Sequence, residues 1–272
     1  MPKSSTMNQI YILAPLFFLV SSLFSMLGMG GGILYVPILL FAGYSMAEAP
    51  VISLILIAGT SLAALSHFLK NRKVDWKLAL VIDPPTDIMA LAGGYFSTLV
   101  PEPALRGILI FVLIIAGTLM IKNRKATTDA TLKKEHWWLW HRSFNGEHYT
   151  VNLPPVLVAT ALIGLLSGML GITGGIIKLP IMVLLCGVPM DIAVATSTVM
   201  VAVTAFSGIA GHAMQQGRID WQTGLILAVA AIAGGLIGSR ISLKTDKARL
   251  KRIFGIMVLI IALQMAIKLF IN

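Results

Sequence analysis

The sequence predicts an all-α polytopic membrane protein made of two inverted-topology repeats of about five helical segments each. Three observations lead to this prediction: the chain is very apolar, one glycine-rich stretch occurs twice, and the basic residues gather in three short segments. Of the 272 residues, 57% are hydrophobic and only 12% are charged, which is typical of an integral membrane protein. Several apolar runs approach the ~20 residues that a helix needs to cross a bilayer.

The glycine-rich stretch opens each repeat. Residues 24–37 read Phe-Ser-Met-Leu-Gly-Met-Gly-Gly-Gly-Ile-Leu-Tyr-Val-Pro, and residues 166–180 read Leu-Ser-Gly-Met-Leu-Gly-Ile-Thr-Gly-Gly-Ile-Ile-Lys-Leu-Pro. Each glycine costs a helix about 1 kcal/mol, so we expect both first helices to break there. In a bilayer, the freed backbone groups of a break must be buried in protein or line a polar cavity. The restarted helix then directs unpaired N–H groups at that cavity, where an anion is favoured. The alternative is that the glycines only allow close helix packing.

Apolar segments follow in the same order in both halves. In the first half they cover residues 10–28, 33–43, 49–69, 78–99 and 105–121, and in the second half 153–171, 175–187, 190–214, 222–240 and 252–270. Two further motifs repeat, because His67-x7-Asp75-Trp76 matches His212-x7-Asp220-Trp221 and Gly93-Gly94 matches Gly234-Gly235. We therefore divide the chain into a first membrane repeat (1–121), a polar cytoplasmic linker (122–152) and a second membrane repeat (153–272).

The basic residues decide how the repeats are oriented. Sixteen of the 21 lysines and arginines fall in residues 70–77, 122–142 and 240–252, which is the pattern of cytoplasmic loops. Four crossings per repeat would place the last of these segments outside. A glycine hairpin instead gives each repeat an odd number of crossings and keeps all three inside, so the repeats are inverted. Two inverted halves are a known basis for alternating access. The bilayer explains the net charge of +10, and no nucleic-acid partner is expected.

Candidate ligand-binding residues lie in the glycine breaks and on the helices that follow them. They are Gly30, Gly31, Gly32, Thr173, Gly174, Gly175, Lys178, Ser197 and Ser53. A lysine inside the membrane costs roughly 2.5–3.5 kcal/mol, so Lys178 needs a negatively charged neighbour. An anionic substrate is one explanation, and snorkelling of the side chain to the cytoplasmic headgroups is the other. The serine and threonine hydroxyls either donate to an oxyanion or bond to the preceding helical turn.

Four further residues are candidates for coupling or gating. Asp83 and Asp87 stand one helical turn apart beside Pro84 and Pro85. Intramembrane carboxylates are candidates for functional groups, so we expect proton or cation coupling, with a hydrated interface as the alternative. His67 and His212 end equivalent helices, where they serve either as gates that titrate near neutral pH or as helix caps.

Other classes of function find no support in the sequence. No nucleophile stands with a base, and no phosphate-binding loop or dinucleotide fingerprint is present, so an enzyme is not expected. Cys186 is the only cysteine, and the linker histidines His136, His141 and His148 lack a ligand spacing. We expect no metal site and no cofactor.

Three sets of motifs stand out in the sequence: the paired glycine motifs Gly-x-Gly-Gly-Gly-x3-Val-Pro and Gly-x-Thr-Gly-Gly-x3-Leu-Pro, the run Ala195-Thr196-Ser197-Thr198, and the two His-x7-Asp-Trp motifs. Together they resemble the TauE/SafE sulfite exporter family. The likeness covers residues 10–270. It implies a multi-pass transporter of the inner or plasma membrane that moves small sulfur-containing anions such as sulfite, sulfonates or sulfoacetate. A carrier for another organic anion and a membrane sensor or assembly component that binds an anion without moving it are the alternatives. Oligomeric state is left open, with a homo-oligomer as one option.

Overall fold

The computed structural model describes residues 4–27, 30–121, 137–172, 174–216, 220–242 and 247–271. Helices dominate both halves. Those of the first half are α1 (Ser4–Ser25), α2 (Gly32–Phe41), α3 (Ala49–Lys70), α4 (Trp76–Ile82), α5 (Pro84–Phe96), a short 3₁₀ turn η1 (Ser97–Leu99) and α6 (Glu102–Ile121). Those of the second half are α7 (Leu153–Leu170), α8 (Gly175–Pro180), a π-helical turn η2 (Ile181–Leu185), α9 (Met190–Gln216), α10 (Trp221–Ser242) and α11 (Lys247–Ile271).

A β-hairpin corrects the all-α prediction. Strands β1 (Leu139–Phe144) and β2 (Glu147–Asn152) pair antiparallel in the region expected to be a polar linker. Asn145 and Gly146 form the two-residue turn with positive φ values of 52° and 80°. Such a turn matches the twist of the flanking strands, which is why Asn-Gly favours tight hairpins.

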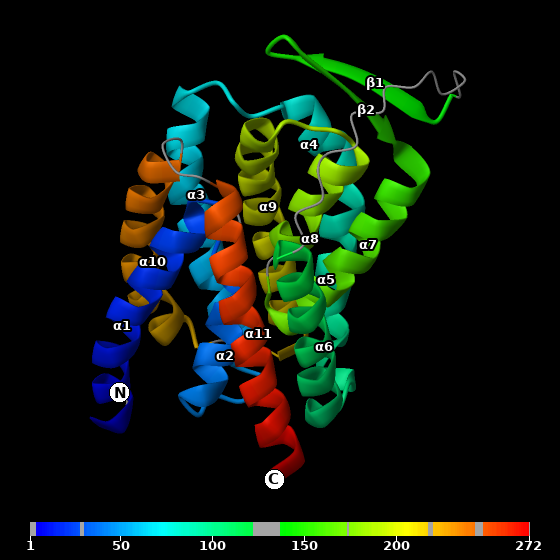
Figure 1. The fold of residues 1–272 in the computed structure, drawn as a ribbon. Helices are drawn as coiled ribbons and strands as arrows, with labels where there is room; N and C mark the ends of the chain where they lie inside the picture. Colours follow the sequence, from blue (N-terminus) through cyan, green and yellow to red (C-terminus); the bar gives the residue numbers. More distant parts are fainter. Residues whose placement is uncertain are drawn as a thin grey trace.

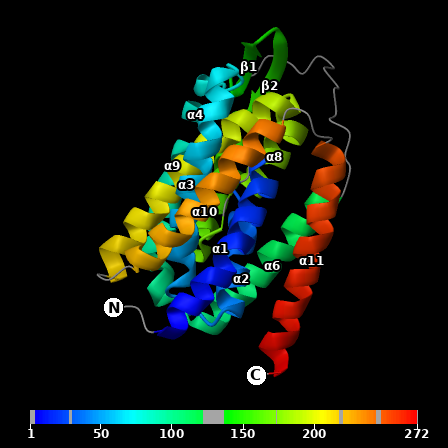
Figure 2. The same cartoon turned by 90° about the vertical axis from the view of Figure 1, so that its left-hand side faces the viewer.

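The helices run roughly parallel to one axis, and the hairpin covers one end of the bundle (Figure 1). The start of α1 and the end of α11 lie at the opposite end (Figures 1 and 2). Helices α1 and α3 run toward the hairpin end, whereas their counterparts α7 and α9 run away from it (Figure 1). The basic ends of α3 and α10 and the start of α11 therefore lie at the hairpin end.

The two halves are interleaved. Helix α10 packs against α1 and α3 of the first half, and α5 packs against α7 and α9 of the second. The paired glycines permit these contacts: a Cβ on Gly93 would lie 2.2 Å from the Leu165 carbonyl oxygen, and one on Gly234 would lie 2.0 Å from the Ser21 hydroxyl. Gly93-Gly94 on α5 and Gly234-Gly235 on α10 thus lie where these helices pack against the other half of the chain.

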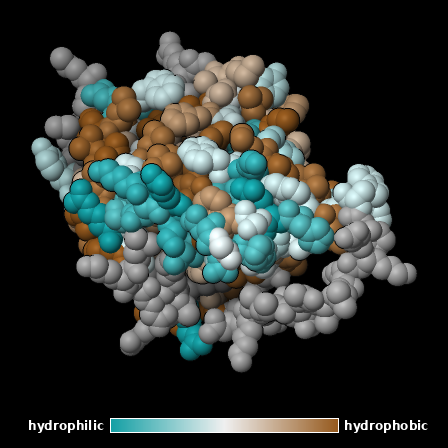
Figure 3. All heavy atoms as spheres, turned by 90° about the horizontal axis from the view of Figure 1, so that it is seen from above, coloured by the Kyte–Doolittle hydropathy of each residue, from teal (hydrophilic) through white to brown (hydrophobic). Residues whose placement is uncertain are grey.

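Five of the described helices are long and apolar enough to cross a membrane: α3, α6, α7, α9 and α10. Large apolar side chains remain exposed on the outer helices, including Leu80, Ile88, Val158 and Val229. Seen from the hairpin end, hydrophilic residues form a band bordered by hydrophobic surface (Figure 3). This distribution suits a bundle whose flanks face lipid, and the prediction of a polytopic membrane protein is confirmed.

Candidate functional site

The first glycine cluster separates α1 from α2. Gly30 and Gly31 both have positive φ values, 65° and 80°, and Gly31 is the N-cap of α2 without a side-chain cap. A Cβ on Gly30 would lie 2.8 Å from the buried hydroxyl of Ser61 on α3. Gly32 is the first residue of the restarted helix. The break at Gly30 therefore passes close to the middle of α3.

The second glycine cluster separates α7 from α8. Gly171 ends α7 with a φ of 64°, whereas Gly174, the N-cap of α8, is in the right-handed region. A Cβ on Gly171 would lie 2.2 Å from Cα of Pro50 at the start of α3. Gly175 begins α8. Thr173 lies outside the described residues, as do residues 28 and 29.

Tyr35 and Lys178 occupy matching places just after these clusters. The Tyr35 hydroxyl lies over Gly31, 2.5 Å from where a Cβ would be, and shares a hydrogen bond of 3.2 Å with Thr60, midway along α3. Cε of Lys178 lies 3.4 Å from the Cβ position of Gly174, and its ammonium donates to the Thr204 hydroxyl at 3.1 Å, midway along α9. One half thus places a hydroxyl group at this depth, and the other places a cation.

The Lys178 ammonium also forms an ion pair with the carboxylate of Asp83, which lies at the junction of α4 and α5. Both side chains are buried, with exposed fractions of 1% for Lys178 and 5% for Asp83. The Thr204 hydroxyl lies 2.9 Å from Oδ1 of Asp87, one turn further along α5. The snorkelling alternative for Lys178 and the hydrated-interface alternative for Asp83 do not describe this geometry, because neither side chain reaches the surface.

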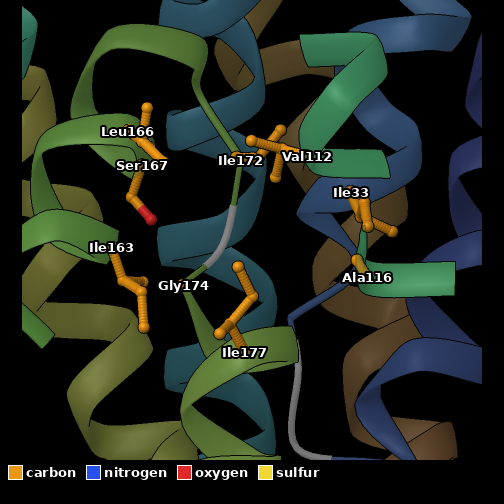
Figure 4. A pocket seen from close by; sticks show the side chains of 9 residues that line it. All are labelled: Ile33, Val112, Ala116, Ile163, Leu166, Ser167, Ile172, Gly174 and Ile177. Atoms are coloured by element: carbon orange, nitrogen blue, oxygen red, sulfur yellow. The ribbon is translucent and has the colours of Figure 1, made fainter. Parts of the chain in front are cut away.

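A small pocket adjoins the second glycine cluster (Figure 4). Its walls come from α2, α6, α7 and the start of α8, and they are Ile33, Val112, Ala116, Ile163, Leu166, Ser167, Ile172, Gly174 and Ile177. Only Ser167 contributes a polar side chain to it. A Cβ on Gly174 would lie 3.0 Å from the Ser167 hydroxyl and 3.4 Å from Lys178, so this glycine separates the pocket from the lysine.

Comparison with known proteins identifies the family. The family model for the sulfite exporter TauE/SafE matches residues 13–265. The chain belongs to the TauE/SafE family. It is 30% identical to the probable membrane transporter YunE of Bacillus subtilis, over 93% of this chain and 96% of that protein. It is 24% identical to the probable membrane transporter YfcA of Escherichia coli K12, over 97% of this chain and 93% of that protein. No solved structure matches significantly. The resemblance to the TauE/SafE family is thereby confirmed, and the chain is a multi-pass membrane transporter.

Two predicted serine residues of this TauE/SafE member make backbone contacts. The Ser53 hydroxyl donates to the carbonyl oxygen of Gly171 at 2.6 Å and thereby joins α3 to the second glycine cluster. The Ser197 hydroxyl donates to the Val194 carbonyl oxygen at 3.0 Å within α9. Both side chains are buried.

The two equivalent histidines have different surroundings. His67 is partly buried at the end of α3, where Nε2 lies 3.3 Å from the amide nitrogen of Asn71. His212 is buried, and its Nε2 lies 2.9 Å from the Gly168 carbonyl oxygen of α7 while Nδ1 lies 3.3 Å from the hydroxyl of Ser97. His212 therefore links α9 to two other elements, whereas His67 bonds within its own helix end.

Thr204, which joins Lys178 to Asp87, is not among the residues predicted from the sequence. Its signal was present, since Thr60 and Thr204 hold the same position in the duplicated third segments. Each also bonds to the carbonyl oxygen four residues earlier, Leu56 or Met200, at 2.8 Å. A hydroxyl repeated at matching depth in both halves indicates a shared structural role.

A second missed cluster fixes the hairpin to the bundle. Nε and a terminal guanidinium nitrogen of Arg142 each lie 2.9 Å from an oxygen of the buried Asp75 carboxylate, and the Tyr149 hydroxyl donates to the same group. Arg142 and Tyr149 are cross-strand partners. Asp75 also caps α4 by accepting from the backbone N–H of Leu78 at 3.2 Å, and its own N–H donates to Thr196 of α9 at 3.0 Å. The Asp-Trp motif is thus a helix cap in both halves, since Asp220 accepts from the N–H of Thr223 at 3.0 Å.

Burial and hydrogen bonding determine the protonation of Asp75 and Tyr149 in this cluster. Burial by itself raises the pKa of Asp75, but the hydrogen bonds from Arg142 and Tyr149 outweigh it and hold the pKa below its ordinary value. Burial, together with the neighbouring carboxylate, raises the pKa of Tyr149. Asp75 is therefore ionised and Tyr149 is neutral at neutral pH.

Proposed function

We propose that this chain is a secondary transporter of the inner or plasma membrane that moves small sulfur-containing anions of the sulfite, sulfonate or sulfoacetate class by alternating access. The two halves form an inverted repeat with glycine-broken first helices. Their relative motion exposes one site near mid-depth to either side of the membrane in turn.

The buried ammonium of Lys178 carries this proposal. It lies on α8 beside the second glycine cluster and contacts Thr204 midway along α9, whereas its counterpart Tyr35 offers only a hydroxyl. A lysine at such depth is expensive unless it has a negatively charged partner, and the ion pair with Asp83 keeps the ammonium charged there. The neighbouring Thr204 hydroxyl can donate to an oxygen of the oxyanion when its single proton turns away from Asp87 or the Met200 carbonyl oxygen.

The arrangement of the helices supports the inverted repeat. Helices α1 and α7 run in opposite directions, as do α3 and α9 (Figure 1). The contacts are also exchanged symmetrically, because α10 packs on α1 and α3 while α5 packs on α7 and α9. A two-fold relation between the halves predicts this exchange.

We assign the binding of the anion to the two glycine clusters and the residues beside them. Backbone N–H groups of Gly30, Gly31, Gly32, Gly174 and Gly175 supply the dipoles, together with the side chains of Thr173, Lys178, Ser197 and Ser53. Oriented amides at the start of a helix favour negative charge. Asp83 and Asp87 are assigned to coupling, and His67 and His212 to gating at the ends of α3 and α9.

Flux measurements in proteoliposomes test the substrate class. We expect labelled sulfite and labelled alkyl sulfonates to enter liposomes that contain the protein, and to exchange in counterflow. A sensor would bind the anion without counterflow, and a carrier of other anions would show competition by those anions instead. Absence of both flux and competition for every sulfur anion would refute the assignment.

The variant Lys178→Ala tests the role of Lys178 in anion binding. We expect it to weaken anion binding at least tenfold per folded molecule, because a buried charge-assisted hydrogen bond contributes about 1.5–3 kcal/mol. Tyr35→Phe is the matched control, since it removes the equivalent polar group from the first half and leaves the cation in place. Equal binding by wild type and Lys178→Ala would remove the lysine from the site.

A further inference from the structure

The buried cluster of Lys178, Asp83, Asp87 and Thr204 joins residues with two different predicted roles. Lys178 was expected to bind the anion, and the two aspartates were expected to couple transport to an ion. In the structure the ammonium contacts Asp83 directly and reaches Asp87 through Thr204. Binding and coupling therefore involve the same few atoms.

The cluster holds one cation for two carboxylates. Among the described residues, the elements packed against α5 add no further charge at this depth: α7 has no titratable side chain, α4 has Lys77 at its start, and α9 has Asp191 and His212 near its ends. Asp83 is the more buried of the two aspartates and makes the direct contact with the lysine. Its ionised form thus depends on Lys178.

An arriving anion competes with Asp83 for the Lys178 ammonium. With Lys178 and both carboxylates ionised, the cluster has a net charge of −1. A bound monovalent anion would make the net charge −2 within a low-dielectric interior. An uncompensated buried carboxylate costs several kcal/mol. One proton on Asp83 returns the net charge to −1 and leaves the ammonium available to the anion.

We propose that Asp83 takes up one proton when the anion binds to Lys178, so that anion and proton cross the membrane together in a 1:1 ratio. This inference rests on the proposed function. The proton adds to a carboxylate oxygen of Asp83 from the side on which the anion enters. It leaves to the other side when the anion leaves and Lys178 pairs with Asp83 again.

Proton uptake on binding is the first test. The purified protein in weakly buffered detergent solution is mixed with ethanesulfonate, which stays ionised near neutral pH and so brings no proton of its own. Wild type is expected to take up about one proton per bound anion, and Asp83→Asn is expected to bind with almost no uptake. Glu102→Gln is the matched control, since its carboxylate is exposed at the start of α6 and pairs with Arg106. It is expected to behave like wild type.

Sensitivity to membrane potential is the second test. Coupled 1:1 movement carries no net charge, so ethanesulfonate accumulation by wild type is expected to ignore an imposed potential. Asp83→Asn moves the anion alone, and about 60 mV is expected to change its accumulation ratio about tenfold. If Asp83→Asn does not fold, the two wild-type measurements decide by themselves.

The outcomes separate this inference from the proposed function. Wild-type binding without proton uptake, or wild-type flux that follows the potential, overturns the coupling role of Asp83 while anion transport stands. Absence of binding and flux for ethanesulfonate, sulfite and sulfoacetate overturns the proposed substrate class, and the coupling with it.

Discussion

Tyr35 and Lys178 are equivalent residues with different chemistry. Each follows a glycine cluster, passes over the glycine that caps its short helix, and hydrogen-bonds to a threonine midway along the next helix, Thr60 or Thr204. In the described part of the chain, only Lys178 has a carboxylate next to it, whereas Tyr35 has none, because Asp83 and Asp87 have no acidic counterpart on α10. The duplicated framework thus carries a site with one charged side and one neutral side.

Removing the lysine alone should destabilise the protein more than removing the whole pair. Lys178→Ala leaves Asp83 buried without its cation, and we expect it to lower the free energy of unfolding by about 3–5 kcal/mol. The double variant Lys178→Ala/Asp83→Asn should recover a large part of that loss. Denaturant unfolding in detergent micelles measures both.

The exposed pair of Arg106 and Glu102 provides the control for this comparison of the single and double variants at Lys178 and Asp83. Arg106→Ala should cost less than about 1 kcal/mol, because solvent screens an exposed ion pair. Additive effects of the two substitutions at Lys178 and Asp83 would show that the pair is not coupled.

Gly171→Ala should destabilise the fold strongly. Its φ of 64° disfavours a side chain, and the new Cβ would meet the backbone of Pro50 at 2.2 Å. We expect a loss of about 2–5 kcal/mol from strain and overpacking together. Gly107→Ala on α6 is the matched control, since nothing lies within 4 Å of its Cβ position. It should be neutral or stabilise by up to about 1 kcal/mol. Equal thermal midpoints for the two variants would contradict the geometry.

Arg142→Ala should release the hairpin. It removes both guanidinium bonds to the buried Asp75 carboxylate, at a cost of about 2 kcal/mol after allowance for the partial exposure of the arginine. Faster proteolysis at the Asn145-Gly146 turn is the expected signal. His141→Ala lies on the same strand but bonds only to Thr150 among the described residues, so it should leave the cleavage rate unchanged. A rate for Arg142→Ala equal to that of His141→Ala would show that the ion pair does not hold the hairpin.

Acid should have the same effect as Arg142→Ala. The pKa of Asp75 is lowered in the folded protein, so the stabilisation is complete above the unfolded value of about 3.9 and is lost as the pH falls through the folded value. Hydrogen exchange of the strand amides, corrected for the intrinsic pH dependence of amide exchange, should therefore accelerate only in the acid part of the range from pH 6 to pH 2.5. Asp75→Asn should abolish the pH dependence, and acceleration at pH 5 would assign it to another group.

Much of the architecture follows from local sequence signals. Most predicted apolar segments coincide with the observed helices to within a few residues, because runs of apolar residues bounded by glycine, proline or charge are a strong signal in membrane proteins. The segment 78–99 is instead divided at Asp83 into α4 and α5, and α1 and α11 begin six and five residues earlier than predicted. The hairpin was missed although Asn145-Gly146 stands between Leu139–Phe144 and Glu147–Asn152, where such a dipeptide favours a tight turn. The polar composition around it concealed that signal.

The composition of the candidate site was predictable only in part. Lys178, Asp83 and Asp87 stand out singly as charges within apolar runs, but Lys178 and Asp83 are 95 residues apart in the chain. Their meeting depends on α5 packing against the other half, which no local pattern encodes. The same holds for Asp75 and Arg142, which are 67 residues apart.

The interleaving of the halves also constrains how the protein is made. Helix α1 lies against α10 along Ser21, Ser22 and Ser25, and the Ser25 hydroxyl donates to the Gly235 carbonyl oxygen 210 residues later at 2.9 Å. During synthesis the ribosome delivers α1 to the bilayer long before α10 exists. The newly inserted helix must therefore wait with its serine face against lipid or against an insertion factor, and the bundle closes only after α10 has left the ribosome.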